Sequence, residues 1–273
     1  PQRHIYSSPY IMKKNGPRVS MLRREGETVD ELLGRRVKFF QKEKGYRFSV
    51  DALLLAHFVR VRKGDLIVDL GTGSGVIAIT VAQRKECGHV IALDIQEELV
   101  DMARRSVMLN SLEEKVDIRH GDIREIETLF RPRSFDVSIF NPPYRKASSG
   151  KLNPDAEKSV ARHEIKGTMH DFLKASVYVL RKSGRAYIIY PATRMVELLA
   201  SMRTAGVEPK RMRIVHSRNV SRGEFVLVEG IKNGREELEV LPPLIIYSED
   251  GQYTEAMNSV FRELSDWPIA SAE

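Results

Sequence analysis

The chain has 273 residues, of which 30% are charged and 42% hydrophobic, an ordinary composition for a soluble globular protein. No apolar run approaches the roughly 20 residues of a membrane-spanning helix, and the N-terminal residues lack the apolar segment of a signal peptide. The single cysteine excludes an internal disulfide, and no cysteine–histidine pattern has the spacing of a zinc site. We therefore expect a cytoplasmic protein that holds no metal.

The net charge of +7 is concentrated near the N-terminus. The first 64 residues contain 15 lysines and arginines and six acidic residues, so they carry +9, and the remaining 209 residues carry −2. This asymmetry favours a polyanionic partner, most simply nucleic acid, although a solubilising tail would have the same charge. Residues 1–24 have six basic and no acidic side chains, which predicts a basic arm over 1–26 that is mobile or ordered by a partner.

Three short elements are expected before the first buried strand. They are a helix over 27–33, a strand over 37–41 and a helix over 50–60. The first helix is indicated by Thr28 followed by Glu31, which is a capping-box pattern. Ser49 is a suitable cap for the helix over 50–60, which has Ala52, Leu55, Ala56 and Val59 on one face.

Strands then alternate with helices along the rest of the chain. Strands are expected at 65–70, 89–93, 115–119, 134–140, 185–190, 210–216 and 224–230, with helices at 76–84, 97–110, 170–181 and 193–204. Such alternation forms a parallel sheet covered by helices on both faces, and the last two strands, which lack an intervening helix, predict an antiparallel edge. The fold class is therefore α/β, with a doubly wound, mostly parallel seven-stranded sheet and an antiparallel edge. A short last strand after Pro242-Pro243 and a helix over 255–264 complete the chain.

The turn after the strand 65–70 is rich in glycine and leads directly into a helix. It reads Gly71-Thr72-Gly73-Ser74-Gly75, in which the glycines let a ligand approach the backbone at a helix N-terminus. The spacing is not the GxGxxG of a dinucleotide binder, and the chain has no GxxxxGK[ST] loop. The turn alone indicates a site for an anion or a nucleotide.

Acidic residues follow the next two strands. Asp94 ends the second strand, where its carboxylate can accept hydrogen bonds from both hydroxyls of a ribose. Asp122 follows the third strand, where it can accept from the exocyclic amine of an adenine. Either aspartate taken singly is also suited to cap a helix. Three such positions at consecutive strand ends predict a site for an adenosine-containing cofactor.

The fourth strand ends at Asn141-Pro142-Pro143-Tyr144. The prolines cannot donate to a sheet and fix the backbone in an extended form. An amide, a carbonyl and an aromatic ring therefore stand at the carboxyl edge of the sheet, where open α/β sheets bind ligands. A plain proline-rich turn is the alternative interpretation. The polar stretch over 145–167 that follows is long enough to suggest a functional loop.

These motifs, in this order, resemble those of class I S-adenosylmethionine-dependent methyltransferases. The matching segments are VDLGTGSGVIAI, ALDIQEELVDMARRSVMLN, GDI and IFNPPY, within about 65–230. The Asn-Pro-Pro-Tyr tetrad is shared by enzymes that methylate adenine N6 and glutamine amides. Two more segments, GYRFSVDALLLA and KSVARHE, are similar to the bacterial family that methylates N6 of the adenine just 3′ of the anticodon in a valine tRNA. That similarity covers about 27–264.

The resemblance implies a Rossmann-like methyltransferase domain over 27–264. Its parts would be a segment over 27–64 that closes the substrate and cofactor sites, a cofactor-binding core over 65–230, and a C-terminal strand and helix over 231–264. The implied cofactor is S-adenosyl-L-methionine, and the implied partner is RNA, most specifically a tRNA anticodon loop.

The resemblance also implies roles for individual residues. The cofactor site would contain Asp69, Gly71, Thr72, Gly73, Gly75, Asp94, Ile95, Asp122, Ile123 and Asn141, closed by Tyr46, Ser49 and Asp51. The catalytic residues would be Asn141, Pro142 and Tyr144, and the substrate would contact Pro143, Tyr144, Arg145, Lys146 and Arg162. Phosphates of the RNA would meet the arm over 1–24 and the basic cluster over 210–213.

The expected chemistry is orientation of a poor nucleophile. The lone pair of an adenine amine is delocalised into the ring, and two acceptors, Asn141 Oδ1 and the Pro142 carbonyl, would direct it toward the methyl group. Tyr144 would stack on the base. Two other functions remain open: glutamine N5-methylation of a protein such as a release factor, and RNA binding without catalysis. The basic arm favours RNA over a protein substrate, and the intact tetrad and glycine loop favour catalysis.

Overall fold

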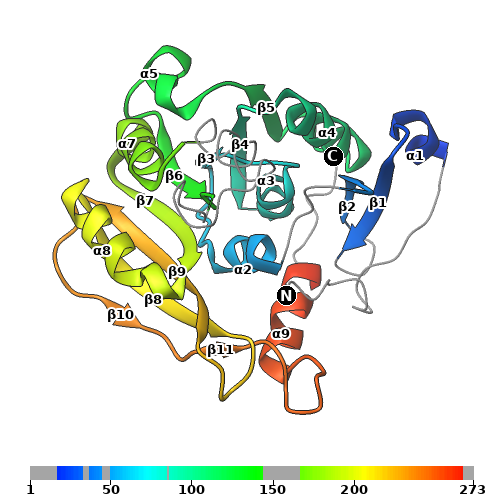
Figure 1. Ribbon diagram of the computed structural model, residues 1–273. Helices are drawn as coiled ribbons and strands as arrows, with labels where there is room; N and C mark the ends of the chain where they lie inside the picture. The colour runs from blue at the N-terminus through cyan, green and yellow to red at the C-terminus, as the bar shows by residue number, and fades with distance from the viewer. Residues whose placement is uncertain (1–16, 33–36, 45–49, 85, 144–166, 267–273) are drawn as a thin grey trace, which may run out of the picture.

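The computed structural model describes residues 17–32, 37–44, 50–84, 86–143 and 167–266 (Figure 1). The strands of the main sheet are β3 (Asp65–Leu70), β4 (Cys87–Asp94), β5 (Val116–His120), β6 (Phe135–Phe140), β7 (Leu180–Pro191), β8 (Val207–His216), β9 (Gly223–Lys232), β10 (Glu239–Val240) and β11 (Leu244–Ile245). The helices are α1 (Pro17–Leu22), α2 (Val50–Phe58), α3 (Val76–Ala82), α4 (Glu97–Leu109), α5 (Ile126–Leu129), α7 (Met169–Val179), α8 (Met195–Thr204) and α9 (Glu255–Asp266), with 3-10 turns η2 (Ile123–Glu125) and η3 (Ala192–Arg194).

The main sheet has the order β5-β4-β3-β6-β7-β9-β8-β10, and β11 also pairs with β8. The strands from β5 to β7 are parallel, whereas β9 is antiparallel to both of its neighbours. This confirms the doubly wound, mostly parallel sheet with an antiparallel edge. The described part of the chain has nine strands in this sheet rather than seven, because two-residue strands β10 and β11 extend the edge.

Apolar helices cover both faces of the sheet. One core cluster joins the sheet to α2, α3, α4 and α9, and the other joins it to α5, α7 and α8. Alternate residues of β3 divide between the clusters: Ile67 belongs to the first, Val68 and Leu70 to the second. Burial on both faces explains why β3 is a continuous apolar run rather than an alternating one. No helix in these ranges is long and apolar enough to cross a membrane.

The predicted helix over 27–33 is wrong. Residues Glu27–Leu32 form strand β1, which pairs in antiparallel fashion with β2 (Val37–Lys42) in a separate two-stranded sheet. The Thr28 hydroxyl donates to Asp30 Oδ1 instead of capping a helix. A helix of six or seven residues has little intrinsic stability, so tertiary pairing decided the outcome.

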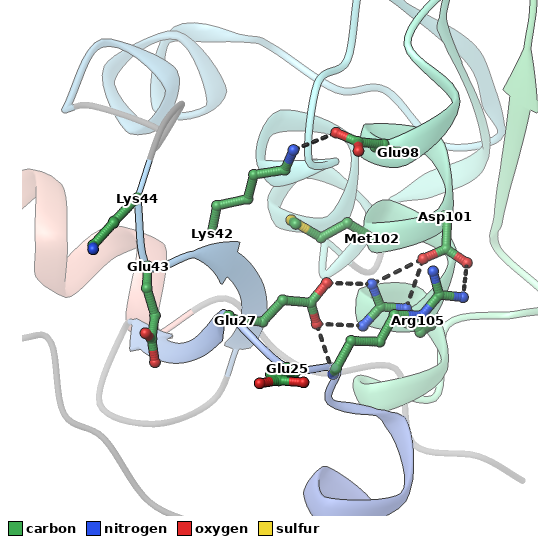
Figure 2. Close-up of a pocket in the computed structure, with 11 residues that line it drawn as sticks. Glu25, Glu27, Lys42, Glu43, Lys44, Glu98, Asp101, Met102 and Arg105 are labelled. Carbon is green, nitrogen blue, oxygen red and sulfur yellow. Dashed lines mark hydrogen bonds and ion pairs between the residues drawn. The ribbon is translucent and has the colours of Figure 1, made fainter.

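The β1–β2 hairpin is fixed to α4 by an ion-pair network (Figure 2). Arg105 Nη1 and Nη2 donate to the two carboxylate oxygens of Glu27 at 2.7 and 2.6 Å, and Nε donates to Asp101 at 2.9 Å. Burial would raise the pKa of Glu27, but the hydrogen bonds from Arg105 lower it overall. The guanidinium also lies 5.0 Å from the Phe40 ring centroid. Arg105 also lines a cavity of about 510 Å³, together with Lys42 and Glu98.

Part of the segment predicted to be a basic arm packs against the rest of the chain. Residues 17–22 form α1, in which Val19 is buried and packs with Phe40 and Met102. Arg24 Nη2 donates to Asp101 at 2.7 Å. These contacts contradict a mobile arm at residues 17–24, while residues 1–16 lie outside the described ranges.

Candidate active site

Pairing registers align the ends of four parallel strands. Leu70 at the end of β3 pairs with Leu93 on one side and Phe140 on the other, so the glycine loop lies level with Asp94 and Asn141. Asp94 in turn pairs with His120, the last residue of β5. The chain proceeds from β3 toward β5 and then returns to the opposite side of β3 at β6. The predicted motifs therefore meet at the topological switch point of the sheet, where α/β folds bind ligands.

The glycine loop requires left-handed backbone at three positions. Gly71, Gly73 and Gly75 have φ values of 72°, 60° and 84°. A Cβ on Gly71 would lie 3.0 Å from the Phe172 ring of α7, and one on Gly75 would lie 3.1 Å from Ala103 Cβ of α4. The loop is therefore held between helices on opposite faces of the sheet. The sequence predicted the glycines but gave no sign that Phe172 supports them.

Asp94 holds the glycine loop as well as the start of the next segment. Its Oδ2 accepts from the Gly73 amide at 2.8 Å, and its Oδ1 accepts from the Gln96 amide at 2.8 Å. The residue is 5% exposed. It does not cap α4, whose N-cap is Gln96. Gln96 Nε2 also donates to Oδ1 at 3.3 Å. Each carboxylate oxygen has about two acceptor positions, so Oδ2 retains one for a ribose hydroxyl.

Asp69 is a fully buried acid beneath the loop. Its Oδ2 accepts from Thr72 Oγ1 at 2.6 Å. Its Oδ1 has no hydrogen-bond partner of good geometry, and the Ala78 amide is near enough to the carboxyl to lower its pKa. Burial raises the pKa of Asp69 to about 7; the charge of Asp94 also raises it, whereas the Thr72 and Ala78 hydrogen bonds lower it. Asp69 is thus a carboxyl that titrates near neutral pH beside a second carboxylate.

Asp122 acts as a cap in this structure. Its side chain accepts from the Arg124 amide at 2.9 Å at the start of η2, and Arg124 Nε lies 2.8 Å from Oδ2. The side-chain hydrogen bond from Arg124 holds the pKa of Asp122 below its ordinary value. The capping alternative is confirmed, and the role toward an adenine amine stays a prediction. Ile123 is buried in the core, and the Ile95 carbonyl lies 2.9 Å from His120 Nε2.

Asn141 lies at the end of β6 beside the N-terminal turn of α2. Its Nδ2 donates to Asp51 Oδ2 at 3.1 Å. The backbone before it is fixed by Phe140, which stacks on Phe172 with ring centroids 5.6 Å apart. Pro142 is buried and Pro143 half-buried. The contact between Asp51 and Asn141 was not predicted from the sequence, which assigned Asp51 to closure of the cofactor site.

Several predicted residues lie outside the described ranges. They are Tyr46, Ser49, Tyr144, Arg145, Lys146 and Arg162, together with most of the loop over 145–167. The basic cluster over 210–213 is described, and it does not form the expected phosphate surface. Arg211 is buried, and its Nε donates to Glu229 at 2.8 Å while Nη2 donates to the Phe58 carbonyl at 2.9 Å.

A different basic segment lies at the edge where the motifs meet. Because β8 has the same direction as β7, the turn from β8 to β9 lies at the carboxyl edge of the sheet, beside Pro191. Arg218 and Arg222 of this turn are exposed, and so is Val220 between them, at 93%. The available sequence signal was a pair of arginines in the short segment SRNVSR over 217–222, between two apolar strands.

Together, these groups can bind and orient a nucleoside-containing cofactor and a planar amine. The glycine loop offers backbone groups, and Asp69 and Asp94 beside it offer carboxylates. The end of β6 offers an amide and a carbonyl at the same edge of the sheet. No strong base or nucleophile is required for transfer of an activated alkyl group to an oriented amine.

Comparisons with known proteins identify the family of the chain. The family model of the methyltransferase small domain matches residues 49–204. The tRNA1(Val) (adenine(37)-N6)-methyltransferase of Bacteroides thetaiotaomicron is 28% identical, over 63% of this chain and 77% of the relative. The enzyme of the same name from Vibrio campbellii is 26% identical, over 81% of this chain and 89% of the relative.

A solved structure supports the fold. The crystal structure of a predicted O-methyltransferase from Agrobacterium tumefaciens has a TM-score of 0.64 and 22% identity, and the similarity covers 79% of this chain and 96% of that one. At this identity the likeness concerns the fold, which is the doubly wound sheet described above.

Proposed function

Because the chain belongs to the methyltransferase small domain family, we propose that it transfers a methyl group from S-adenosylmethionine to N6 of an adenine in tRNA. The curated relatives that carry this activity in their names support the choice of acceptor. The observation that carries the proposal is the level register of Leu70, Leu93 and Phe140, which places the glycine loop, Asp94 and Asn141 at one edge.

The residues present fit the cofactor. When bound, S-adenosylmethionine supplies a methyl group on a positively charged sulfonium. Asp94 would accept a ribose hydroxyl at the position that Gly73 leaves open on Oδ2, while Gln96 occupies Oδ1. Asp69 supplies buried negative charge without a full set of partners, and a cationic ligand favours the ionised form of a nearby carboxyl.

The chain's part in the reaction is to orient the acceptor amine. Asn141 Oδ1 and the Pro142 carbonyl would each accept one N–H of the adenine amine. Two acceptors in a fixed geometry draw the nitrogen from planar toward tetrahedral and direct its lone pair at the incoming carbon. The extended backbone of Pro142-Pro143 and the stacking of Phe140 on Phe172 hold these acceptors in place.

RNA suits the electrostatics of the chain. The sequence carries +7, and Arg218 and Arg222 are exposed at the same sheet edge as Asn141. A target base must be unstacked to reach such a site, which costs least in a single-stranded loop. An anticodon loop meets this requirement.

The proposal is tested with methyl-labelled S-adenosylmethionine and three mixtures: total tRNA, a release factor, and no acceptor. Label should appear in tRNA and be recovered as N6-methyladenosine after nuclease digestion. Asn141→Ala should lower turnover by about 10²–10³ with nearly unchanged cofactor affinity. Label on a glutamine of the release factor would instead identify an N5-glutamine methyltransferase, and label in neither would refute both readings.

A further inference from the structure

Asp51 is buried and points at the proposed catalytic amide. It is 6% exposed, its Oδ1 accepts from the Ala52 amide at 2.8 Å, and its Oδ2 accepts from Asn141 Nδ2 at 3.1 Å. An ionised carboxylate only accepts hydrogen bonds. The atom of Asn141 that faces it must therefore be the amide nitrogen, and Oδ1 must face the other way.

The orientation of this amide decides whether Asn141 can accept a hydrogen bond from the adenine amine. An adenine amine donates two hydrogens, so it needs the oxygen of the amide and is opposed by the nitrogen. The two ends of a free carboxamide are similar in size and exchange by rotation about a soft torsion. A partner that selects one end removes the wrong orientation before the substrate binds.

We propose that Asp51 is the positioning residue that fixes the Asn141 amide with its oxygen toward the acceptor amine. The inference rests on the proposed function, because that function gives Asn141 its role. The expected part of Asp51 in closing the cofactor site stays a prediction beside it.

The helix that carries Asp51 is anchored firmly enough for this task. Carbonyls at its C-terminal end and just beyond it accept from three arginines that lie far away in the sequence. Arg84 Nη2 lies 3.0 Å from the Ala56 carbonyl, Arg211 Nη2 lies 2.9 Å from that of Phe58, and Arg185 Nη1 lies 2.6 Å from that of Arg60. Cations at this end also suit the helix dipole.

Two of these arginines are themselves fixed by acidic residues. Arg185 Nη2 donates to Asp65 at 2.6 Å, and Arg211 donates to Glu229. The intervening residues Leu53, Leu54 and Leu55 are buried in the core. Asp51 therefore projects from a rigid helix, and a rigid support is what a positioning contact requires.

The test exchanges the two side chains. In Asp51→Asn, one oxygen cannot serve both Ala52 and Asn141. If that oxygen keeps the Ala52 amide, the new amide nitrogen faces Asn141 and turns it the wrong way. Asn141→Asp alone sets two carboxylates against each other. In the double variant, the amide at position 51 donates to the carboxylate at position 141, whose other oxygen is again an acceptor for the amine.

We expect kcat for tRNA methylation to fall by about 10²–10³ in Asp51→Asn, which turns the Asn141 amide the wrong way. Asp51→Ala should lower kcat by a smaller factor, because it only frees the amide to rotate. The Kd for the cofactor should stay within about threefold of wild type, which corresponds to less than 1 kcal/mol of binding free energy. The double variant should be at least about tenfold more active than Asp51→Asn. Such non-additivity is the signature of two side chains acting as one unit.

Asp136→Asn is the matched control, because it makes the same substitution at the opposite end of β6. Its carboxylate accepts from the Leu66 amide and from Arg181, away from the site, and kcat should stay within about twofold of wild type. Asp51 variants with wild-type kcat, a double variant no better than Asp51→Asn, or cofactor affinity lost in parallel with activity would each overturn the inference.

An NMR measurement separates this inference from the proposed function. In protein labelled with ¹⁵N-asparagine, the side-chain amide signal of Asn141 is the one missing from Asn141→Asp. Asp51→Ala should shift that signal and speed its hydrogen exchange at least about tenfold. If wild type methylates no RNA, the proposed function fails while this readout still decides the inference. An unchanged signal would exclude the contact.

Discussion

The Asp94 carboxylate accepts a hydrogen bond from the Gly73 backbone amide at 2.8 Å. The predicted ribose acceptor at the end of β4 therefore also holds the glycine loop that follows β3. One side chain thus connects two motifs that lie 21 residues apart. Loss of this carboxylate should affect cofactor binding in two ways, through a missing acceptor and through a less ordered loop.

Asp94→Ala should weaken S-adenosylmethionine binding by about 1.5–3 kcal/mol, the scale of hydrogen bonds to a charged group. Titration calorimetry measures this directly. Asp117→Ala on the neighbouring strand is the control, because Asp117 is partly exposed and forms a surface ion pair with Arg119. Equal affinity of Asp94→Ala and wild type would exclude Asp94 as the ribose acceptor.

Gly71→Ala should destabilise the fold through both backbone and packing. A left-handed φ costs an alanine about 1–2 kcal/mol, and its Cβ would lie 3.0 Å from the buried Phe172 ring, which adds about 1–3 kcal/mol of overpacking. Chemical denaturation should show a loss of about 2–5 kcal/mol in the free energy of unfolding.

Gly26→Ala separates those two contributions. Gly26 has a nearly identical φ of +74°, but a Cβ there would meet nothing within 4 Å. It should therefore lose only the backbone cost of about 1–2 kcal/mol. If both variants lost the same amount, close contact with Phe172 would have no part in the requirement for glycine at position 71.

Asp69 should make the fold less stable as the pH rises toward neutral. Its pKa is raised from 3.8 to about 7 in the native state, so between about pH 4 and 7 the native protein binds more protons than the unfolded chain. Stability falls with pH in that window, by about 3–5 kcal/mol over the whole range. The difference in unfolding free energy between wild type and Asp69→Asn, measured from pH 4 to 8, isolates this contribution.

The same group predicts a proton linkage in cofactor binding. A cationic ligand favours ionised Asp69, so binding near pH 6.5 should release a proton. Calorimetry in buffers of different ionisation enthalpy counts that proton. Asp69→Asn should show no such release, and a wild-type protein with no release at this pH would mean that the cofactor does not interact with Asp69.

The sequence predicted the elements of the main sheet well because their signals are local. Each apolar strand is followed by glycine, aspartate or proline, and periodic helices lie between. The prediction failed at 27–33, where the pairing of β1 with β2 and the ion pair between Glu27 and Arg105 outweigh a weak capping pattern. Both contacts join residues that the local sequence does not relate.

In the site, too, local signals were predicted from the sequence, and contacts between distant residues were not. Residues at strand ends could be placed from the sequence because parallel strands bring their carboxyl ends to one edge. The contact of Asp51 with Asn141 spans 90 residues, and the support of Gly71 by Phe172 spans more than 100. The burial of Arg211 likewise depends on Phe58 and Glu229, which is why basic composition alone assigned it wrongly to an RNA surface.

Arg218 and Arg222 should bind RNA phosphates near the site. Both are exposed in the turn from β8 to β9, at the edge that carries Asn141. Contacts to phosphates position RNA without reading its sequence, so the same adenine should still be modified when they are lost.

The double variant Arg218→Ala, Arg222→Ala should weaken tRNA binding and flatten the plot of log affinity against log salt. Each lost contact to a single-stranded phosphate reduces the slope by about 0.7, so the expected change is about 1.4. Arg235→Ala is the control, because Arg235 is also exposed but follows the opposite end of β9. Binding measured by fluorescence anisotropy from 50 to 300 mM salt distinguishes the cases. Equal slopes for the control and the double variant would mean that the turn does not contact RNA. In every case, we expect both variants to bind the cofactor with wild-type affinity.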